Sequence, residues 1–164
     1  MENIKENISI SDIWELMKAI NDPEIPVLSV TDLGIVRDIK LKDGEVEVVI
    51  TPTYSGCPAM DVISTSIRMA LLREGFNTIK ITRQLAPAWT TDWMSREGKE
   101  KLKSYGIAPP SVRTYDKNHE DPVIECPLCY SKNTKLISQF GSTSCKALYQ
   151  CNDCLEPFDY FKCH

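Results

Sequence analysis

Histidine is nearly absent from this chain of 164 residues, which contains only two. Both follow residue 118, so a Ser–His–Asp triad has no candidate base in the longer, N-terminal part of the chain. No Gly-rich phosphate loop and no dinucleotide-binding fingerprint occurs either. These absences argue against hydrolases of the triad type and against nucleotide-dependent enzymes.

Long hydrophobic runs and an excess of positive charge are also missing. No apolar run approaches the ~18 residues of a membrane-spanning helix, and the first residues lack the pattern of a signal peptide. The net charge is −4 and the pI about 5.2, whereas a general nucleic-acid binder would normally be basic. We therefore expect a cytoplasmic protein that binds neither nucleic acid nor membrane.

Cysteine, in contrast, is abundant and unevenly placed. Of seven cysteines, Cys57 is alone before residue 126. In a reducing compartment, cysteines serve more often as metal ligands or reactive thiols than as disulfides. The remaining cysteines crowd the C-terminal part of the chain: Cys126, Cys129, Cys145, Cys151, Cys154 and Cys163.

Hydrophobic periodicity predicts a small α+β domain of order α-β-β-α-β, followed by a Cys-rich module. Asp43-Gly44 favours a tight hairpin between the first two strands. The predicted helices cover 9–21, 58–75 and 95–105, and the predicted strands cover 35–41, 45–50 and 77–83. We place the first domain at 1–108, a linker at 109–122 and a zinc-ribbon-like module at 123–164. A module of roughly 40 residues needs a stabilising cross-link, or staple, such as a bound metal ion, besides its hydrophobic core.

Two C-x-x-C knuckles, Cys126-Pro127-Leu128-Cys129 and Cys151-Asn152-Asp153-Cys154, provide that staple. Such turns present four thiolates to one tetrahedral cation, so we predict one structural zinc ion per chain. Four thiolates also bind a single iron or an Fe–S cluster, which leaves iron open. Cys145, Cys163 and His164 are candidates for further ligands, although free cysteines are also common core residues.

Cys57 lies in the loop 51–58, directly before Pro58 and at the predicted start of a helix. Free amides and the positive end of the helix dipole favour a thiolate there, and Gly56 leaves room for access to the sulfur. Such a thiolate can bind a soft metal or attack an electrophile. A buried structural thiol is the alternative.

Two further features have both a functional and a structural interpretation. Asp22 and Glu24 flank Pro23, and so close a pair can coordinate a metal or only end a helix. Trp89 and Trp93 offer a partner surface, unless their loop folds back over the core. An edge strand of the small sheet also offers a way for two copies to form a homodimer.

Three stretches resemble the SufT-like domain family, which is associated with iron–sulfur protein assembly: DPEIP at 22–26, DLGIV at 32–36 and TPTYSGCP at 51–58. The resemblance implies a small α+β fold with a reactive cysteine in a loop before a helix. On the matching positions, it implies that Cys57 contacts a cluster or reacts. Asp22, Glu24 and Thr51 would line the same pocket.

The remaining motifs resemble the D subunits of phenylacetyl-CoA epoxidase systems, over nearly the whole chain. They are LAPAWTTDWM at 85–94, the CPLC knuckle, and residues 140–164. This resemblance implies a non-enzymatic accessory protein of aerobic phenylacetate degradation. Its expected role is maturation or repair of an iron–sulfur or iron centre, with transient binding of an Fe–S cluster. The other epoxidase subunits are the implied partners, and the iron–sulfur reductase is the first of them. A structural subunit and a rubredoxin-like electron carrier stay open as alternatives.

Overall fold

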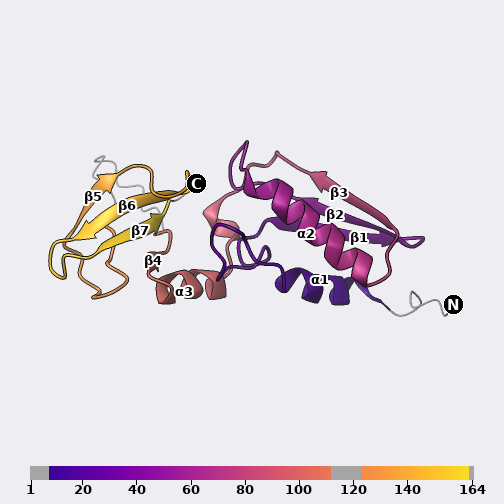
Figure 1. Cartoon of the computed structure of the whole chain (residues 1–164), viewed down its shortest axis with the longest axis horizontal. Coiled ribbons are helices and arrows are strands. Elements are labelled where there is room, and N and C mark those ends of the chain that lie inside the picture. The colour runs from indigo at the N-terminus through magenta and orange to yellow at the C-terminus, as the bar shows by residue number, and fades with distance from the viewer. Residues whose placement is uncertain (1–7, 112–122, 163–164) are drawn as a thin grey trace. The chain divides into compact units, whose positions relative to one another are not determined.

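The structure is a computed structural model that describes residues 8–111 and 123–162 (Figure 1). The chain divides into two compact units, Met1–Ser95 and Arg96–His164. Within the described ranges, no helix has the length and hydrophobicity that crossing a membrane requires.

Among its described residues, the first unit has a three-stranded sheet, two α-helices and one 3₁₀ helix. β1 and β2 pair antiparallel, whereas β2 and β3 pair parallel, with α2 as the crossover. Figure 1 shows α2 running across one face of the sheet with α1 beside it. The elements are α1 (Ile10–Lys18), β1 (Val36–Lys42), β2 (Glu45–Ile50), α2 (Ala59–Arg73) and β3 (Thr78–Arg83), followed by the 3₁₀ helix η2 (Thr91–Trp93). The predicted α+β class and element order are confirmed.

Local sequence explains where these helices begin. The hydroxyl of Ser9 accepts a hydrogen bond from the Asp12 N–H, and the Asp12 carboxylate accepts one from the Ser9 N–H, which is a capping box. Ile13 and Met17 are the buried residues of α1, one turn apart. α2 begins at Ala59 with Pro58 as its N-cap, one residue later than predicted.

Residues 84–95, which we call the strap, fold back over the first unit. The indole N–H of Trp89 donates to the Leu33 carbonyl oxygen at 2.8 Å, and only 4% of Trp89 is exposed. Ser95 donates from its N–H and its hydroxyl to Asp32, at 2.8 and 3.0 Å. The interpretation of Trp89 as a partner surface is therefore wrong, because burying the indole satisfies both its hydrophobic area and its N–H.

Trp93 is half-buried rather than fully exposed, so the second tryptophan does not provide an open aromatic surface either. The Arg37 guanidinium lies 3.5 Å from the centroid of its ring. This is a cation–π contact between β1 and the strap. Both tryptophans thus fasten the strap to the first unit.

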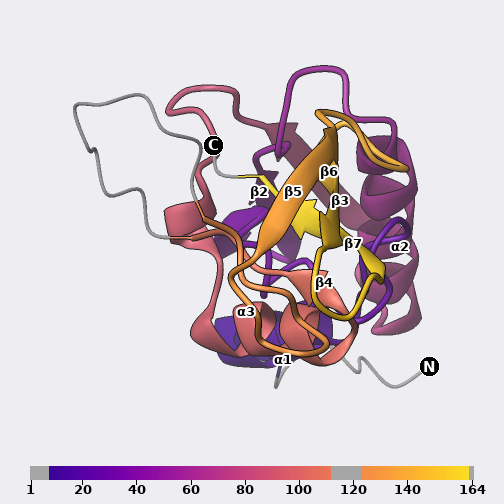
Figure 2. The ribbon, with the colours of Figure 1, turned by 90° about the vertical axis from the view of Figure 1, so that its left-hand side faces the viewer.

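In the part that the structure describes, the second unit has a four-stranded sheet in the order β4-β7-β6-β5 and one helix. β4 pairs parallel with β7, and the other neighbouring strands pair antiparallel. Figure 2 shows β5, β6 and β7 side by side. The elements are α3 (Arg96–Ser104), β4 (Ile107–Ala108), β5 (Thr134–Ser138), β6 (Lys146–Cys151) and β7 (Pro157–Phe161).

The boundary between the units lies after Ser95, not at 108 as the sequence predicts. The reason is packing: Leu102 of α3 is fully buried, and β4 adds a strand to the ribbon sheet. The prolines at 109–110 follow the end of β4 and lie inside the second unit, so they do not mark the boundary. Residues 112–122 of the predicted linker lie outside the described residues.

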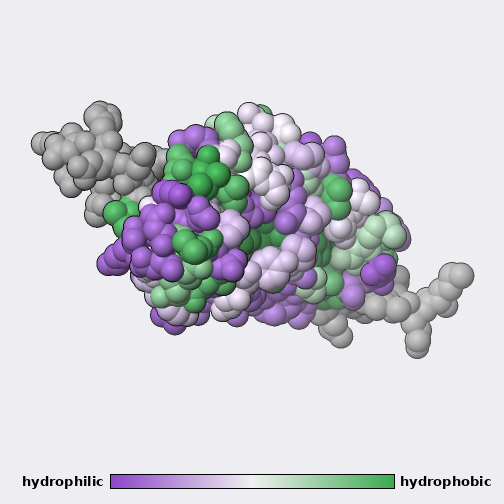
Figure 3. Space-filling model, turned by 60° about the vertical axis from the view of Figure 1, so that its left-hand side comes forward, coloured by the Kyte–Doolittle hydropathy of each residue, from purple (hydrophilic) through white to green (hydrophobic). Residues whose placement is uncertain are grey.

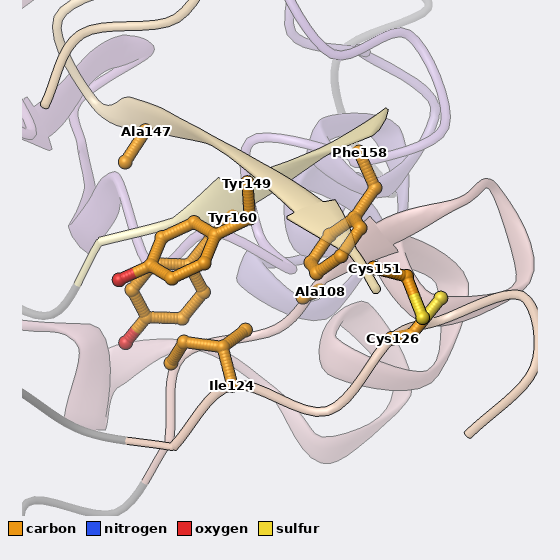
Figure 4. Packing of buried hydrophobic residues seen from close by; sticks show 8 residues of the cluster. All are labelled: Ala108, Ile124, Cys126, Ala147, Tyr149, Cys151, Phe158 and Tyr160. Atoms are coloured by element: carbon orange, nitrogen blue, oxygen red, sulfur yellow. The ribbon is translucent and has the colours of Figure 1, made fainter. Parts of the chain in front are cut away.

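The second unit has a hydrophobic core of its own (Figure 4). The ring of Tyr149 stacks on Phe158 at 6.0 Å between centroids and meets Tyr160 edge to face at 5.6 Å. Aromatic pairs of this kind contribute beyond the area that they bury. The cluster comprises Ala108, Ile124, Cys126, Ala147, Tyr149, Cys151, Phe158 and Tyr160.

Candidate functional site

The four knuckle cysteines converge at one end of the ribbon sheet. All four sulfurs lie within 4.8 Å of one another. Cys126 and Cys154 are 3.8 Å apart, and Cys129 and Cys151 are 3.5 Å apart. Figure 4 shows the side chains of Cys126 and Cys151 pointing toward each other. A tetrahedral ion with Zn–S bonds of ~2.3 Å places its ligands ~3.8 Å apart, so the group fits such an ion.

The backbone of the two knuckles turns in the same way. In each, the residue after the second cysteine has a positive φ, 63° for Tyr130 and 66° for Leu155. In the first knuckle, the Cys126 N–H donates to the carbonyl oxygen of Ser131, five residues later, at 2.9 Å. In the second, the Cys151 N–H donates to the carbonyl oxygen of Glu156 at 3.0 Å. These turns direct all four sulfurs to the same point.

The thiols of the second knuckle differ in acidity. The backbone N–H of Cys154 donates to the Cys151 sulfur at 3.5 Å and lowers the pKa of Cys151 to about 7. For Cys154, the backbone N–H of Glu156 lowers the pKa, but desolvation and the neighbouring sulfurs outweigh it and raise the pKa to about 12. A bound cation would stabilise adjacent thiolates together, so the raised pKa of Cys154 would no longer keep its thiol protonated.

Cys57 lies in the other unit, in the loop between β2 and α2. Its side chain is half-buried, and its N–H donates to the Tyr54 carbonyl oxygen at 3.2 Å. Pro58 is the N-cap of α2, and no side chain caps this end of the helix. Cys57 therefore precedes the N-cap by one residue, whereas the sequence predicted Cys57 at the helix start itself. The loop follows the carboxyl end of β2, which is parallel to β3. Carboxyl ends of parallel strands are the usual place for ligands in such units.

Thr51 begins this loop and has an unusual side chain. It is 1% exposed, and its hydroxyl is the one buried side-chain N or O atom without a hydrogen-bond partner among the described residues. Its N–H donates to the Ile35 carbonyl oxygen at 2.9 Å, which ties the loop to the start of β1. A buried hydroxyl with no partner needs an explanation such as a ligand or a water molecule.

Asp22 and Glu24 lie in the segment between α1 and β1. One carboxylate oxygen of Asp22 accepts hydrogen bonds from the N–H groups of Glu24 and Ile25, both at 2.8 Å. Asp22 is 7% exposed and Glu24 is half-buried. Asp22 thus holds a turn after α1, the more ordinary of its two interpretations. That these carboxylates share a pocket with Cys57 and Thr51 stays a prediction.

Cys145 is not part of the four-sulfur group. It is 4% exposed, and its sulfur lies 3.0 Å from the hydroxyl oxygen of Thr143. This geometry fits a core residue better than the further ligand that the sequence also allowed. Cys163 and His164 lie outside the described residues.

Sequence reasoning missed the apolar side chains that surround the knuckles. Leu128, Tyr130 and Leu155 are 53%, 62% and 68% exposed. On the face drawn in Figure 3, hydrophobic patches lie among hydrophilic ones. The only sequence signal for these side chains is their position inside or directly after a C-x-x-C motif.

Two family models match the chain. The model described as "Iron-sulfur cluster assembly protein" matches residues 10–78, and that described as "PaaD zinc beta ribbon domain" matches residues 110–162. Fold and site therefore define a two-module protein, with an assembly-type domain followed by a zinc ribbon. In Escherichia coli (strain K12), a protein named as a putative subunit of 1,2-phenylacetyl-CoA epoxidase is 51% identical over 94% of this chain and 93% of its own length. The chain belongs to this PaaD family.

Two more distant relatives match just over half of the chain. The "Fe-S protein maturation auxiliary factor" of Porphyromonas gingivalis is 38% identical over 56% of this chain and 88% of its own length. The crystal structure of a domain of unknown function, DUF59, from Bacillus anthracis has a TM-score of 0.52 at 26% identity. It covers 56% of this chain and 89% of that domain. The assembly-protein model matches residues of the first unit, whereas the likeness to the Escherichia coli relative extends over both units.

Proposed function

We propose that this chain is an accessory factor of a phenylacetyl-CoA epoxidase system that helps to mature or repair an iron–sulfur or iron centre. The expected client is the iron–sulfur reductase, with the other epoxidase subunits as further partners. The chain itself performs no catalytic step in this role. Cys57 contacts the cluster during transfer, and the ribbon zinc has a structural role.

The position of Cys57 is the observation that carries this proposal. The thiol is partly accessible, lies between a strand end and an uncapped helix start, and follows the orphaned hydroxyl of Thr51. A thiolate in such a loop is a suitable terminal ligand for an Fe–S cluster. The assembly-protein model matches the segment that contains this loop, which supports the same interpretation.

A permanent structural subunit is the second candidate, because the Escherichia coli relative is named as part of the epoxidase. In that case Cys57 would be dispensable, and the complex would need the chain continuously. The rubredoxin-like alternative has less support, since the ribbon matches a zinc model. Only in this last candidate would the ribbon metal itself change oxidation state.

The test is to produce the epoxidase subunits and the reductase in cells that lack this protein and to supply it as wild type or as Cys57→Ser. We expect the reductase purified with the variant to contain several-fold less iron and sulfide, because the cluster-contacting thiol is missing. Ser55→Ala, at an exposed position of the same loop, is the matched control and should leave both contents at the wild-type level.

A full iron and sulfide content of the reductase with Cys57→Ser would overturn the maturation role. Separating the finished reductase from this protein then distinguishes the second candidate. A maturation factor leaves a reductase that keeps its cluster and its activity, whereas removing a structural subunit would lower the epoxidase activity of the complex at once.

A further inference from the structure

A chain of polar side chains joins the two knuckles without involving the sulfurs. The Ser131 hydroxyl donates to one carboxylate oxygen of Asp153, and the Asn133 amide donates to the other at 2.9 Å. The Asn152 amide donates to the side-chain oxygen of Asn133, also at 2.9 Å. We call Ser131, Asn133, Asn152 and Asp153 the knuckle clamp.

Backbone bonds continue the clamp into both metal-binding turns. The Asn152 N–H donates to the Asn133 carbonyl oxygen at 2.8 Å, and the Asn133 N–H donates to the Ser131 hydroxyl at 3.0 Å. The Ser131 carbonyl oxygen accepts from the Cys126 N–H at 2.9 Å, so the clamp begins at the first ligand. At its other end, Asn152 and Asp153 are the two residues between Cys151 and Cys154.

We propose that the knuckle clamp positions the four cysteines for the metal and slows its release. Each knuckle supplies two sulfurs, so losing the ion requires the two turns to separate or tilt. The clamp joins these turns from outside the sulfur group, and its bonds must break before they separate. Groups of this kind around metal ligands commonly change metal affinity by about 10-fold or more.

The charge of Asp153 allows a positioning effect of the clamp to be told apart from a purely electrostatic effect. Binding Zn²⁺ by four cysteines converts neutral thiols into a centre of net charge −2, so a neighbouring carboxylate by itself disfavours the loaded site. If charge alone mattered, removing the Asp153 carboxylate would slow metal release. If the clamp matters, the same change accelerates release, so the sign of the effect separates the two explanations.

The experiment follows zinc release from the full-length, zinc-loaded protein into an excess of a chromogenic chelator. We expect Ser131→Ala to release zinc about 10-fold faster than wild type, since it breaks two clamp bonds without changing charge. Ser131→Thr keeps the hydroxyl and should restore a rate near that of the wild type. Asp153→Ala should also accelerate release, against the direction that charge alone predicts.

Glu156→Gln is the charge control. It removes one exposed carboxylate two residues after Cys154 and should not accelerate release. The Co²⁺-substituted variants should keep the absorption of a tetrahedral four-thiolate site, which shows that the ligands are intact. Their thermal midpoints without metal should stay near the wild-type value, because the core around Tyr149 is unchanged. Release from Ser131→Ala at or below the wild-type rate would overturn the proposal.

Discussion

At the scale of single residues, Gly34 determines whether the strap can pack against the rest of the first unit. Its φ is +69°, and an added Cβ would collide with the carbonyl oxygen and Cβ of Trp93. Gly34→Ala therefore combines an unfavourable backbone conformation with a steric clash. We expect it to lower the free energy of unfolding of the first unit by about 3 kcal/mol in urea titrations.

Gly44→Ala is the matched control for this prediction. Gly44 has a similar φ of +79°, but an added Cβ would meet nothing within 4 Å. It should cost about 1 kcal/mol, from the backbone conformation alone. Equal losses for the two variants would mean that the contact with Trp93 does not hold the strap.

The same scale shows what sequence reasoning can reach. The spacing of the two C-x-x-C motifs was enough to group four ligands, since each knuckle is a local turn. The burial of Trp89 and the position of the Thr51 backbone depend on contacts with distant segments, namely with the carbonyl oxygens of Leu33 and Ile35. Such long-range contacts leave no local pattern in the sequence. The sequence alone therefore allowed two interpretations of the tryptophans, an exposed surface and a loop folded over the core.

At the scale of elements, β2 places Glu47 between two lysines of its neighbouring strands. Its carboxylate accepts from the Thr82 hydroxyl at 2.6 Å and pairs with Lys80 at 2.9 Å and with Lys40 at 3.6 Å. The Thr82 hydrogen bond, followed by Lys80, lowers the pKa of Glu47 to about 2 from its ordinary 4.5. The folded state therefore favours the ionised form.

This shift predicts a pH dependence with a definite sign. Because the folded pKa is the lower one, the stabilisation by Glu47 is complete above pH 4.5 and is lost as the pH falls toward 2. Urea titrations of Glu47→Gln should show a weaker fall in stability over that range than those of the wild type. Glu45→Gln, on the same face of β2, should keep the wild-type slope, and a Glu47→Gln slope equal to it would contradict the prediction.

The elements themselves were largely predictable, because each carries its own local signal. Asp43-Gly44 predicted the hairpin between β1 and β2, and the apolar spacing of Ile13 and Met17 predicted α1. The sheet that a short element joins was harder to predict. The two residues of β4 are too few to show a period, and α3 has only Gly98 and Leu102 buried, so neither indicated which sheet it joins.

At the scale of the whole molecule, the boundary after Ser95 changes what the ribbon needs in order to fold. Leu102 is fully buried, Ala108 is part of the aromatic cluster, and Lys103 pairs with Glu125 at 3.0 Å. A ribbon cut at the prolines loses all of these contacts. Burial of Leu102 alone is worth about 2 kcal/mol.

We therefore expect the zinc-loaded fragment 96–164 to melt at a clearly higher temperature than the fragment 109–164, and to lose zinc more slowly to a chelator. For the first unit, 1–95 and 1–108 should melt at the same temperature, because α3 and β4 contribute to the other core. If 109–164 were as stable as 96–164 and 1–108 more stable than 1–95, α3 and β4 would support the first unit instead. The predicted boundary at 108 would then describe the molecule better, and the ribbon metal would be the main staple of a module as small as the sequence suggested.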